Sequence, residues 1–216
     1  QALYEKYVQF LFSKQKLYPC SCSRKKLFEE NPVNADGEVI YSGHCLKNPI
    51  NKNSDFALRF KTPDKTITWE DLLLGKFEEN PKNQCGDFTI KDRISQWTYQ
   101  FAVCVDDLEE NIGLVVRGED LRNSTARQIA LLEALGKKTP PLYLHHPLLT
   151  EKSGEKLSKR QHSKSLRAEL EQGLSIEDLL GLVCYEAHSI PKKAPLTLNE
   201  AIYSIQKTYF SCFLKK

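Results

Sequence analysis

The sequence contains no methionine, and it begins at Gln1. A natural reading frame starts with methionine, so we expect the 216 residues to be a piece of a longer protein. No apolar run approaches the length of a bilayer span, and the first residues lack the basic-then-apolar pattern of a secretory signal peptide. The seven cysteines are too scattered for the disulfide framework of a small secreted domain. These absences argue against a membrane or secreted protein, and we expect a reducing, cytoplasmic setting.

Neither sign of charge dominates, because the formal net charge is only +3 and the pI is about 8.4. This balance neither demands nor excludes a nucleic-acid partner. The hydrophobic content of 40% and the charged content of 27% are those of an ordinary globular protein. The length suffices for one sizeable core, or for one domain with an insert. We see no internal repeat, and we expect a monomer.

Hydrophobic periodicity predicts a mixed α/β chain. Residues 2–15 have a helical period, which Pro19 ends. Between residues 55 and 69 the period changes to two, with Phe56, Leu58 and Phe60 alternating with polar residues, which predicts strands of a small β insert. The apolar run 99–105 fits either a strand or a short helix. Further elements are expected as strands at 88–90, 113–116 and 142–149, a helix from Ser124 to Leu135 stopped by Gly136, and helices that begin at Ser175 and Thr197.

Three cysteines near the N-terminus have a spacing that suits a metal. Cys20 and Cys22 form a Cys-x-Cys pair, and Cys45 follows a turn-forming stretch. Three thiolates and a fourth donor can hold a tetrahedral Zn²⁺, which would close a loop that has little core of its own. Donor chemistry favours His44 as the fourth ligand over Tyr41, because phenolate rarely binds zinc. Three metal-free thiols in an irregular loop are the alternative.

Two further stretches carry charge where a ligand could bind. Arg117 lies at the end of the strand expected at 113–116, and in an open parallel sheet such residues line the ligand crevice. There an arginine can grip a carboxylate bidentately, although a surface ion-pair partner is the simpler interpretation. Downstream, Glu155-Lys156-Leu157-Ser158-Lys159-Arg160 follows Gly154, and a loop of this kind can bring an ammonium group to the phosphates of a nucleotide. A solvated basic loop is the alternative.

Taken together, these stretches resemble a known family. The run Val115-Val116-Arg117-Gly118-Glu119-Asp120-Leu121 and the run 156–160, in that order, resemble the second half of a class I aminoacyl-tRNA synthetase catalytic domain of the glutamate/glutamine branch. The basic loop is similar to the KMSKS signature of that class, with Leu157 and Arg160 at its variable places. Cys-x-Cys followed by Tyr-x₃-Cys resembles the zinc insert of glutamyl-queuosine tRNA(Asp) synthetases.

The resemblance implies an activity and a set of substrates. The enzyme would activate glutamate with ATP and Mg²⁺, and it would transfer glutamate to the queuosine base in the anticodon of tRNA(Asp). Lys159 and Lys156 would be catalytic, with Lys159 binding ATP. Tyr99 and Arg117 would bind glutamate, whereas from the residues alone Tyr99 is equally a core aromatic. The reaction needs no side-chain base, so His145 is interpreted as a packing or nucleotide contact. No role is assigned to His146.

The resemblance also implies a ligand set and a division into domains. Its fourth zinc ligand is tyrosine, which gives Cys20, Cys22, Tyr41 and Cys45. We expect residues 1–95 to form a helix plus the zinc-binding β insert, 96–165 the second half of a Rossmann-type nucleotide-binding domain, and 166–216 a C-terminal helical segment. The HIGH signature of the class is not among these residues, so its half of the domain is expected to be absent and the 216 residues alone to be inactive.

Two other functions stay open at this point. The chain could belong to a glutamyl-tRNA synthetase that charges a tRNA 3′ end. It could also be a non-catalytic, zinc-bearing RNA-binding module, whose binding would depend steeply on salt.

Overall fold

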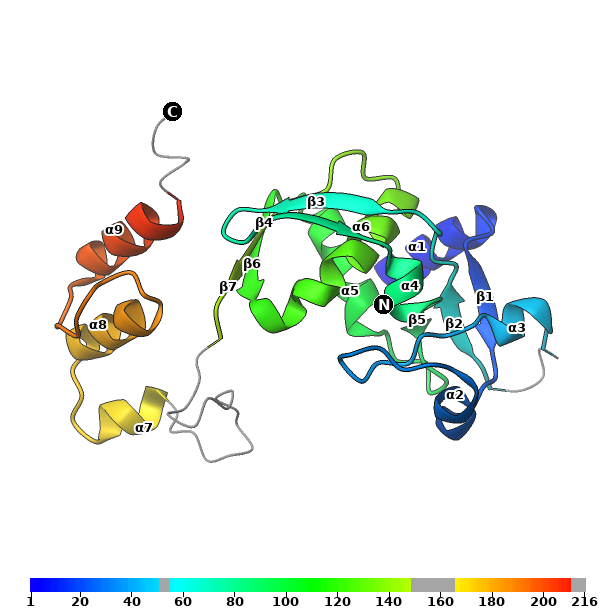
Figure 1. Cartoon of the computed structure of the whole chain (residues 1–216), viewed down its shortest axis with the longest axis horizontal. Helices are drawn as coiled ribbons and strands as arrows, with labels where there is room; N and C mark the ends of the chain where they lie inside the picture. Colours follow the sequence, from blue (N-terminus) through cyan, green and yellow to red (C-terminus); the bar gives the residue numbers. More distant parts are fainter. Residues whose placement is uncertain (51–54, 149–165, 211–216) are drawn as a thin grey trace. The chain divides into compact units, whose positions relative to one another are not determined.

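The computed structural model describes residues 1–50, 55–148 and 166–210 of the chain (Figure 1). They divide into two compact units. We call Gln1–Val115 with Leu121–Leu144 the first unit, and Val116–Asp120 with His145–Lys216 the second unit. No helix within the described ranges is both long and apolar enough to span a membrane.

The described elements include both helices and strands, as periodicity predicts. In chain order they are α1 (Ala2–Ser13), β1 (Leu17–Cys20), α2 (Arg24–Glu30), α3 (His44–Lys47), β2 (Ala57–Phe60), β3 (Ile67–Asp71), β4 (Gly75–Glu79), α4 (Pro81–Cys85), β5 (Thr89–Lys91), α5 (Tyr99–Glu109), β6 (Leu114–Gly118), the 3₁₀-helix η1 (Glu119–Ser124), α6 (Thr125–Ala134), β7 (Leu142–His146), α7 (Leu166–Glu171), α8 (Ile176–Glu186) and α9 (Leu198–Tyr209).

An antiparallel three-stranded sheet has the order β1-β2-β5. The strand β1 was not anticipated, because Pro19 was interpreted only as the end of the preceding helix. Pro19 is nevertheless compatible with β1, since β1 lies at the edge of this sheet and one side of its backbone needs no ladder partner. Cys20 pairs with Ala57 at one end of the β1–β2 ladder. Cys20, the first cysteine of the predicted metal site, is therefore anchored in regular structure.

The second sheet has the order β4-β3-β7-β6. Here the sequence-based expectation for β3 was wrong: β3 does not join β2 in an insert, but pairs antiparallel with β4 and parallel with β7. The burial of β3 alternates, with Ile67 and Trp69 inside, so one face of the sheet is apolar. Trp69 stacks on Phe77 of β4, with ring centroids 4.6 Å apart. The pairing of β3 with β7 joins residues more than 70 positions apart, Asp71 and Tyr143, and local periodicity cannot predict it.

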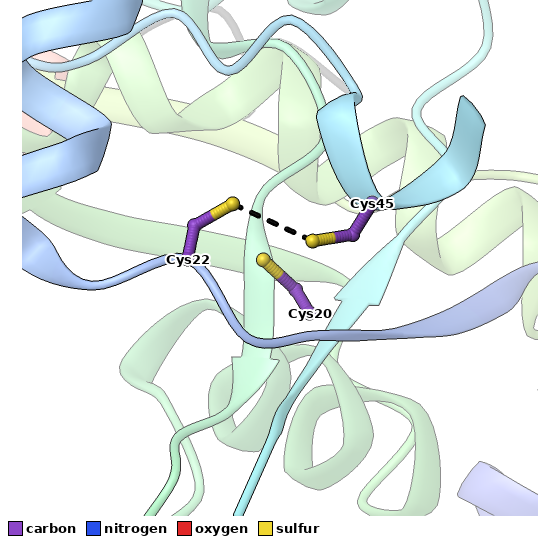
Figure 2. Close-up of side chains that lie close together, drawn as sticks. All are labelled: Cys20, Cys22 and Cys45. Carbon is purple, nitrogen blue, oxygen red and sulfur yellow. Dashed lines mark hydrogen bonds between the residues drawn. The ribbon is translucent and has the colours of Figure 1, made fainter. Parts of the chain in front are cut away.

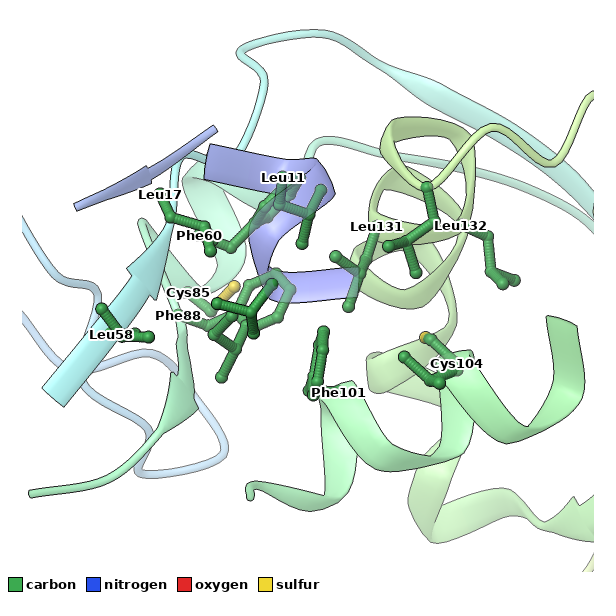
Figure 3. Close-up of a cluster of buried hydrophobic side chains, with 14 residues drawn as sticks. Leu11, Leu17, Leu58, Phe60, Cys85, Phe88, Phe101, Cys104, Leu131 and Leu132 are labelled. Carbon is green, nitrogen blue, oxygen red and sulfur yellow. The ribbon is translucent and has the colours of Figure 1, made fainter. Parts of the chain in front are cut away.

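The main core of the first unit lies between the three-stranded sheet and three helices. Figure 3 shows Leu11 of α1, Phe60 of β2, Phe101 of α5 and Leu131 of α6 in one cluster of buried side chains. Each of these four side chains has 0% of its surface exposed. The run 99–105 is thus a helix, which places Phe101, Cys104 and Val105 on one buried face. Periodicity had left its type undecided, and the packing of α5 against α6 settles it.

The helices of the second unit begin where their capping residues predict. Ser175 caps α8 in a capping box with Asp178, and Thr197 caps α9 in a capping box with Glu200. The helix α8 packs on the segment before α9 at Gly181, where an added Cβ would lie 1.8 Å from the carbonyl oxygen of Ala194. The three predicted helix starts at Ser124, Ser175 and Thr197 are confirmed.

Candidate functional site

The three cysteines of the predicted metal site come together in the structure. Figure 2 shows the sulfurs of Cys20, Cys22 and Cys45 turned toward one another, and all three lie within 4.8 Å of one another. Cys20 ends β1, Cys22 follows it, and Cys45 lies on the short helix α3. The Cys22 and Cys45 sulfurs are 3.4 Å apart. Tetrahedral Zn²⁺ with Zn–S bonds of about 2.3 Å needs sulfurs about 3.8 Å apart, so the donor set fits this ion.

Tyr41, not His44, completes this cluster of donors. The Tyr41 hydroxyl oxygen lies 3.4 Å from the Cys20 sulfur and 3.5 Å from the Cys22 sulfur. It also accepts a hydrogen bond of 2.9 Å from the backbone N–H of Cys45. His44 Nε2 lies 3.3 Å from the Lys26 ammonium instead, outside the group of sulfurs. Donor chemistry alone favours His44, but the geometry favours Tyr41: His44 and Cys45 are successive residues of α3, so their side chains point in different directions.

The environment of the cluster changes the acidity of its donors. Burial raises the pKa of the Cys22 thiol to about 11, and burial together with the hydrogen bonds to the sulfurs raises the pKa of Tyr41. For Cys45, burial opposes ionisation, but hydrogen bonds from the Tyr41 hydroxyl and the Ser21 N–H lower its pKa to about 7. A thiol with that pKa is substantially thiolate near neutral pH, which is the form that binds metals.

The buried segment Cys85–Asp87, which sequence analysis did not single out, supports the backbone of Tyr41. The backbone of Tyr41 bridges to Gly86, and its N–H donates to the Cys85 carbonyl at 3.2 Å. Next to Gly86, the fully buried Asp87 carboxylate accepts from the Tyr18 hydroxyl at 2.8 Å and from the Lys82 ammonium at 2.5 Å. Sequence analysis missed this segment because neither a glycine nor a lone aspartate in a loop is a specific signal.

Arg117 is held by a buried histidine within the second unit. Its Nε donates a hydrogen bond of 2.9 Å to His145 Nε2, and His145 has 0% of its surface exposed. The acceptor role of Nε2 requires the neutral tautomer that carries the proton on Nδ1. Arg117 and His145 lie near the carboxyl ends of β6 and β7, which are neighbours in the sheet. His145 thus contacts the predicted carboxylate-binding residue.

The remaining predicted residues are placed separately. Tyr99 is the first residue of α5 in the first unit and is 50% exposed, so it is not a core aromatic. His146 is exposed, and its Nδ1 lies 2.9 Å from the Pro147 carbonyl. Lys156 and Lys159, with the rest of the basic loop, lie outside the described residues.

Comparison with known proteins finds relatives that match most of this chain. The family model described as tRNA synthetases class I (E and Q), catalytic domain, matches residues 1–193. A curated relative named Glutamyl-Q tRNA(Asp) synthetase, from Neisseria meningitidis, is 38% identical over 168 residues, which cover 76% of this chain and 56% of the relative. A protein of the same name from Geobacter sulfurreducens is 38% identical over 163 residues, covering 74% and 52%. The chain spans about half the length of the curated relatives it matches.

A solved structure has a similar fold. Glutamate-tRNA synthetase from Elizabethkingia anophelis superposes with a TM-score of 0.68, covering 95% of this chain and 53% of that chain. The sequence identity is only 22%, so this likeness concerns the fold alone.

Proposed function

The chain belongs to the class I tRNA synthetases of the glutamate and glutamine branch, in their catalytic domain, and on that premise we propose that the whole protein activates glutamate and attaches it to tRNA(Asp). The α/β catalytic-domain fold of this class, expected from the sequence, is confirmed. The acceptor on the tRNA would be the queuosine base of the anticodon. The observation that carries this choice is the 38% identity to relatives whose name specifies Glutamyl-Q tRNA(Asp).

The proposed activation is a nucleophilic substitution at the α-phosphorus of ATP, and it needs no side-chain base. The α-carboxylate of glutamate attacks the α-phosphorus of ATP, the bond to the β-phosphate oxygen breaks, and glutamyl-adenylate and pyrophosphate form. Catalysis then depends on positioning and on charge stabilisation. Lys159 and Lys156 would stabilise charge on the phosphates, Mg²⁺ would bind the phosphates with ATP, and Arg117 and Tyr99 would hold glutamate. We propose a monomer that acts in the cytoplasm.

The experiment that tests this proposal is glutamate-dependent ATP–pyrophosphate exchange by the complete protein, followed by transfer of labelled glutamate to tRNA. Label on queuosine-containing tRNA(Asp), and none on tRNA(Asp) that lacks queuosine, is the expected result. Label on a tRNA 3′ end would instead support the glutamyl-tRNA synthetase alternative. Absence of exchange together with RNA binding that weakens steeply with salt would support the non-catalytic module.

Replacing Arg117 by alanine is expected to raise the half-saturating glutamate concentration by about 10- to 100-fold, because a hydrogen-bonded charge pair contributes about 1.5 to 3 kcal/mol. The ATP requirement should change little. Arg122→Ala is a matched control, since the Arg122 guanidinium instead pairs with Glu79 at 3.3 Å. An unchanged glutamate saturation curve for Arg117→Ala would contradict the assigned role.

We also propose that Cys20, Cys22, Tyr41 and Cys45 hold a structural Zn²⁺. When bound, the ion would cross-link β1, the segment after it and α3, a short helix whose only buried residue is Cys45. The purified protein is then expected to contain about one zinc per chain, and Cys45→Ser should lose most of it together with thermal stability. Cys184→Ser is the control, because Cys184 is a buried thiol on α8, outside the cluster. Full zinc content in Cys45→Ser would exclude this ligand set.

A further inference from the structure

Arg59 is a buried cation directly behind the proposed metal site. It lies on β2 with only 7% of its surface exposed, and its guanidinium carbon is 3.8 Å from the centre of the Tyr41 ring. Alternation along β2 predicts Arg59 on the polar face. The register of β2 against β5 shifts between Leu58 and Arg59, however, and both side chains are buried. Such irregularities change the direction of side chains. In β2 the irregularity coincides with Arg59, whose guanidinium lies over the ring of Tyr41.

Within the described residues, no carboxylate forms an ion pair with this buried guanidinium. The Asp87 carboxylate is occupied by Lys82, by the Tyr18 hydroxyl and by the Thr62 N–H, at 2.5, 2.8 and 3.0 Å. Arg59 Nη1 donates to the Asp87 carbonyl at 2.6 Å, and Nε has no hydrogen-bond partner among those residues. Burying an uncompensated cation costs several kcal/mol, whereas a desolvated cation–π contact recovers only about 2 kcal/mol. A compensating negative charge is therefore expected nearby.

We propose that Arg59 is the counter-ion of the metal centre and a positioning residue for Tyr41. This rests on the zinc assignment proposed above. Zn²⁺ bound by three thiolates and one phenolate has a net negative charge, and the Arg59 guanidinium lies against the ring that bears the phenolate. Its positive charge offsets part of the net negative charge of the zinc-loaded centre, and its position over the ring, 3.8 Å from the ring centre, holds the Tyr41 side chain in place. This supplies a physical reason for a tyrosine ligand where donor chemistry alone favours histidine.

A double-mutant cycle separates this role from simple packing. Zn²⁺ affinity would be measured by competition with a chromogenic chelator for wild type, Arg59→Gln, Tyr41→Phe and the double variant. If Arg59 acts mainly through Tyr41, Arg59→Gln should weaken zinc binding by about tenfold in the wild-type background and by about threefold or less in the Tyr41→Phe background, where the phenolate is gone but the three thiolates still leave one net negative charge on the centre. Equal losses in both backgrounds would overturn the proposal, because a packing defect does not depend on the Tyr41 oxygen.

Thermal unfolding with and without zinc gives a second, independent readout. Removing a buried cation that has no carboxylate partner among the described residues should leave the Tm of the zinc-free protein unchanged or higher, while the Tm of the zinc-loaded protein falls. A fall of the same size in both forms would overturn the counter-ion role. If Arg59→Gln does not fold, Arg59→Lys replaces it in the cycle, with an expected loss of about threefold because the charge stays and the stacking is lost.

The outcomes also distinguish this proposal from the one on which it rests. A wild-type protein that binds no zinc would overturn both the ligand set and the role of Arg59. A wild-type protein that binds zinc, with an additive cycle, would overturn the role of Arg59 alone.

Discussion

Gly86→Ala is expected to destabilise the first unit by about 3 to 5 kcal/mol. Gly86 has φ +64° and ψ −146°, a backbone conformation that is essentially restricted to glycine. An added Cβ would lie 2.1 Å from the carbonyl oxygen of Tyr41 and 2.7 Å from its nitrogen. These contacts are with backbone atoms, so no side-chain rotation relieves them. The backbone strain at residue 86 and the steric overlap of the added Cβ with Tyr41 both destabilise the segment that supports Tyr41.

The measurement for this variant is the free energy of unfolding in denaturant, together with zinc content. Gly75→Ala is the matched control, because Gly75 also has a positive φ of +86° but has no heavy atom within 4 Å of the added Cβ. That variant carries the conformational strain alone, and we expect a cost of about 1 kcal/mol with zinc retained. Equal stability losses at the two positions would show that the close approach to Tyr41 is unimportant.

Lys159→Ala is expected to lower the rate of glutamate activation by about 100- to 1000-fold, the usual effect of removing one group that stabilises transition-state charge. The half-saturating glutamate concentration should change by less than about threefold, because Lys159 is proposed to contact phosphates rather than glutamate. The effect would therefore appear in kcat, in contrast to the effect of Arg117→Ala on the glutamate requirement.

ATP–pyrophosphate exchange by the complete protein measures this effect. Lys193→Ala is the control, since the Lys193 ammonium forms an exposed ion pair of 3.4 Å with Glu186. Exchange near the wild-type rate in Lys159→Ala would remove Lys159 from the catalytic set. A rise in the glutamate requirement without a fall in kcat would reassign it to substrate binding.

Local sequence signals predicted the starts of α6, α8 and α9 and most of the strands. Capping residues such as Ser175 and Thr197 act within one turn of helix, so the information lies beside them in the chain. The run 99–105 was ambiguous because a short, mostly apolar segment has too little periodicity to distinguish helix from strand. The partner of β3 was missed for a related reason. Pairing Asp71 with Tyr143 depends on the whole intervening chain.

At the proposed metal site, local sequence signals and tertiary contacts complement each other. Thiols separated by one residue, with a third thiol across a turn, indicate a metal whatever the fold is. The rank of Tyr41 and His44 as fourth donor depends on which side chain points inward. That direction is set by the turn at Gly43 and by the bridge from Tyr41 to Gly86. For the same reason no inspection of the sequence identifies Arg59, which alternation places on the polar face.

The sequence by itself determined the donors available for a metal, the caps of the helices and the family signature around Arg117. Each of these depends on the chemistry of residues that are near one another in the chain. Only the tertiary structure decided that Tyr41 joins the cysteines, that His145 holds Arg117 and that Arg59 is buried against the Tyr41 ring at the proposed metal site. These facts depend on contacts between distant segments, and a register shift or a single glycine changes which side chains meet.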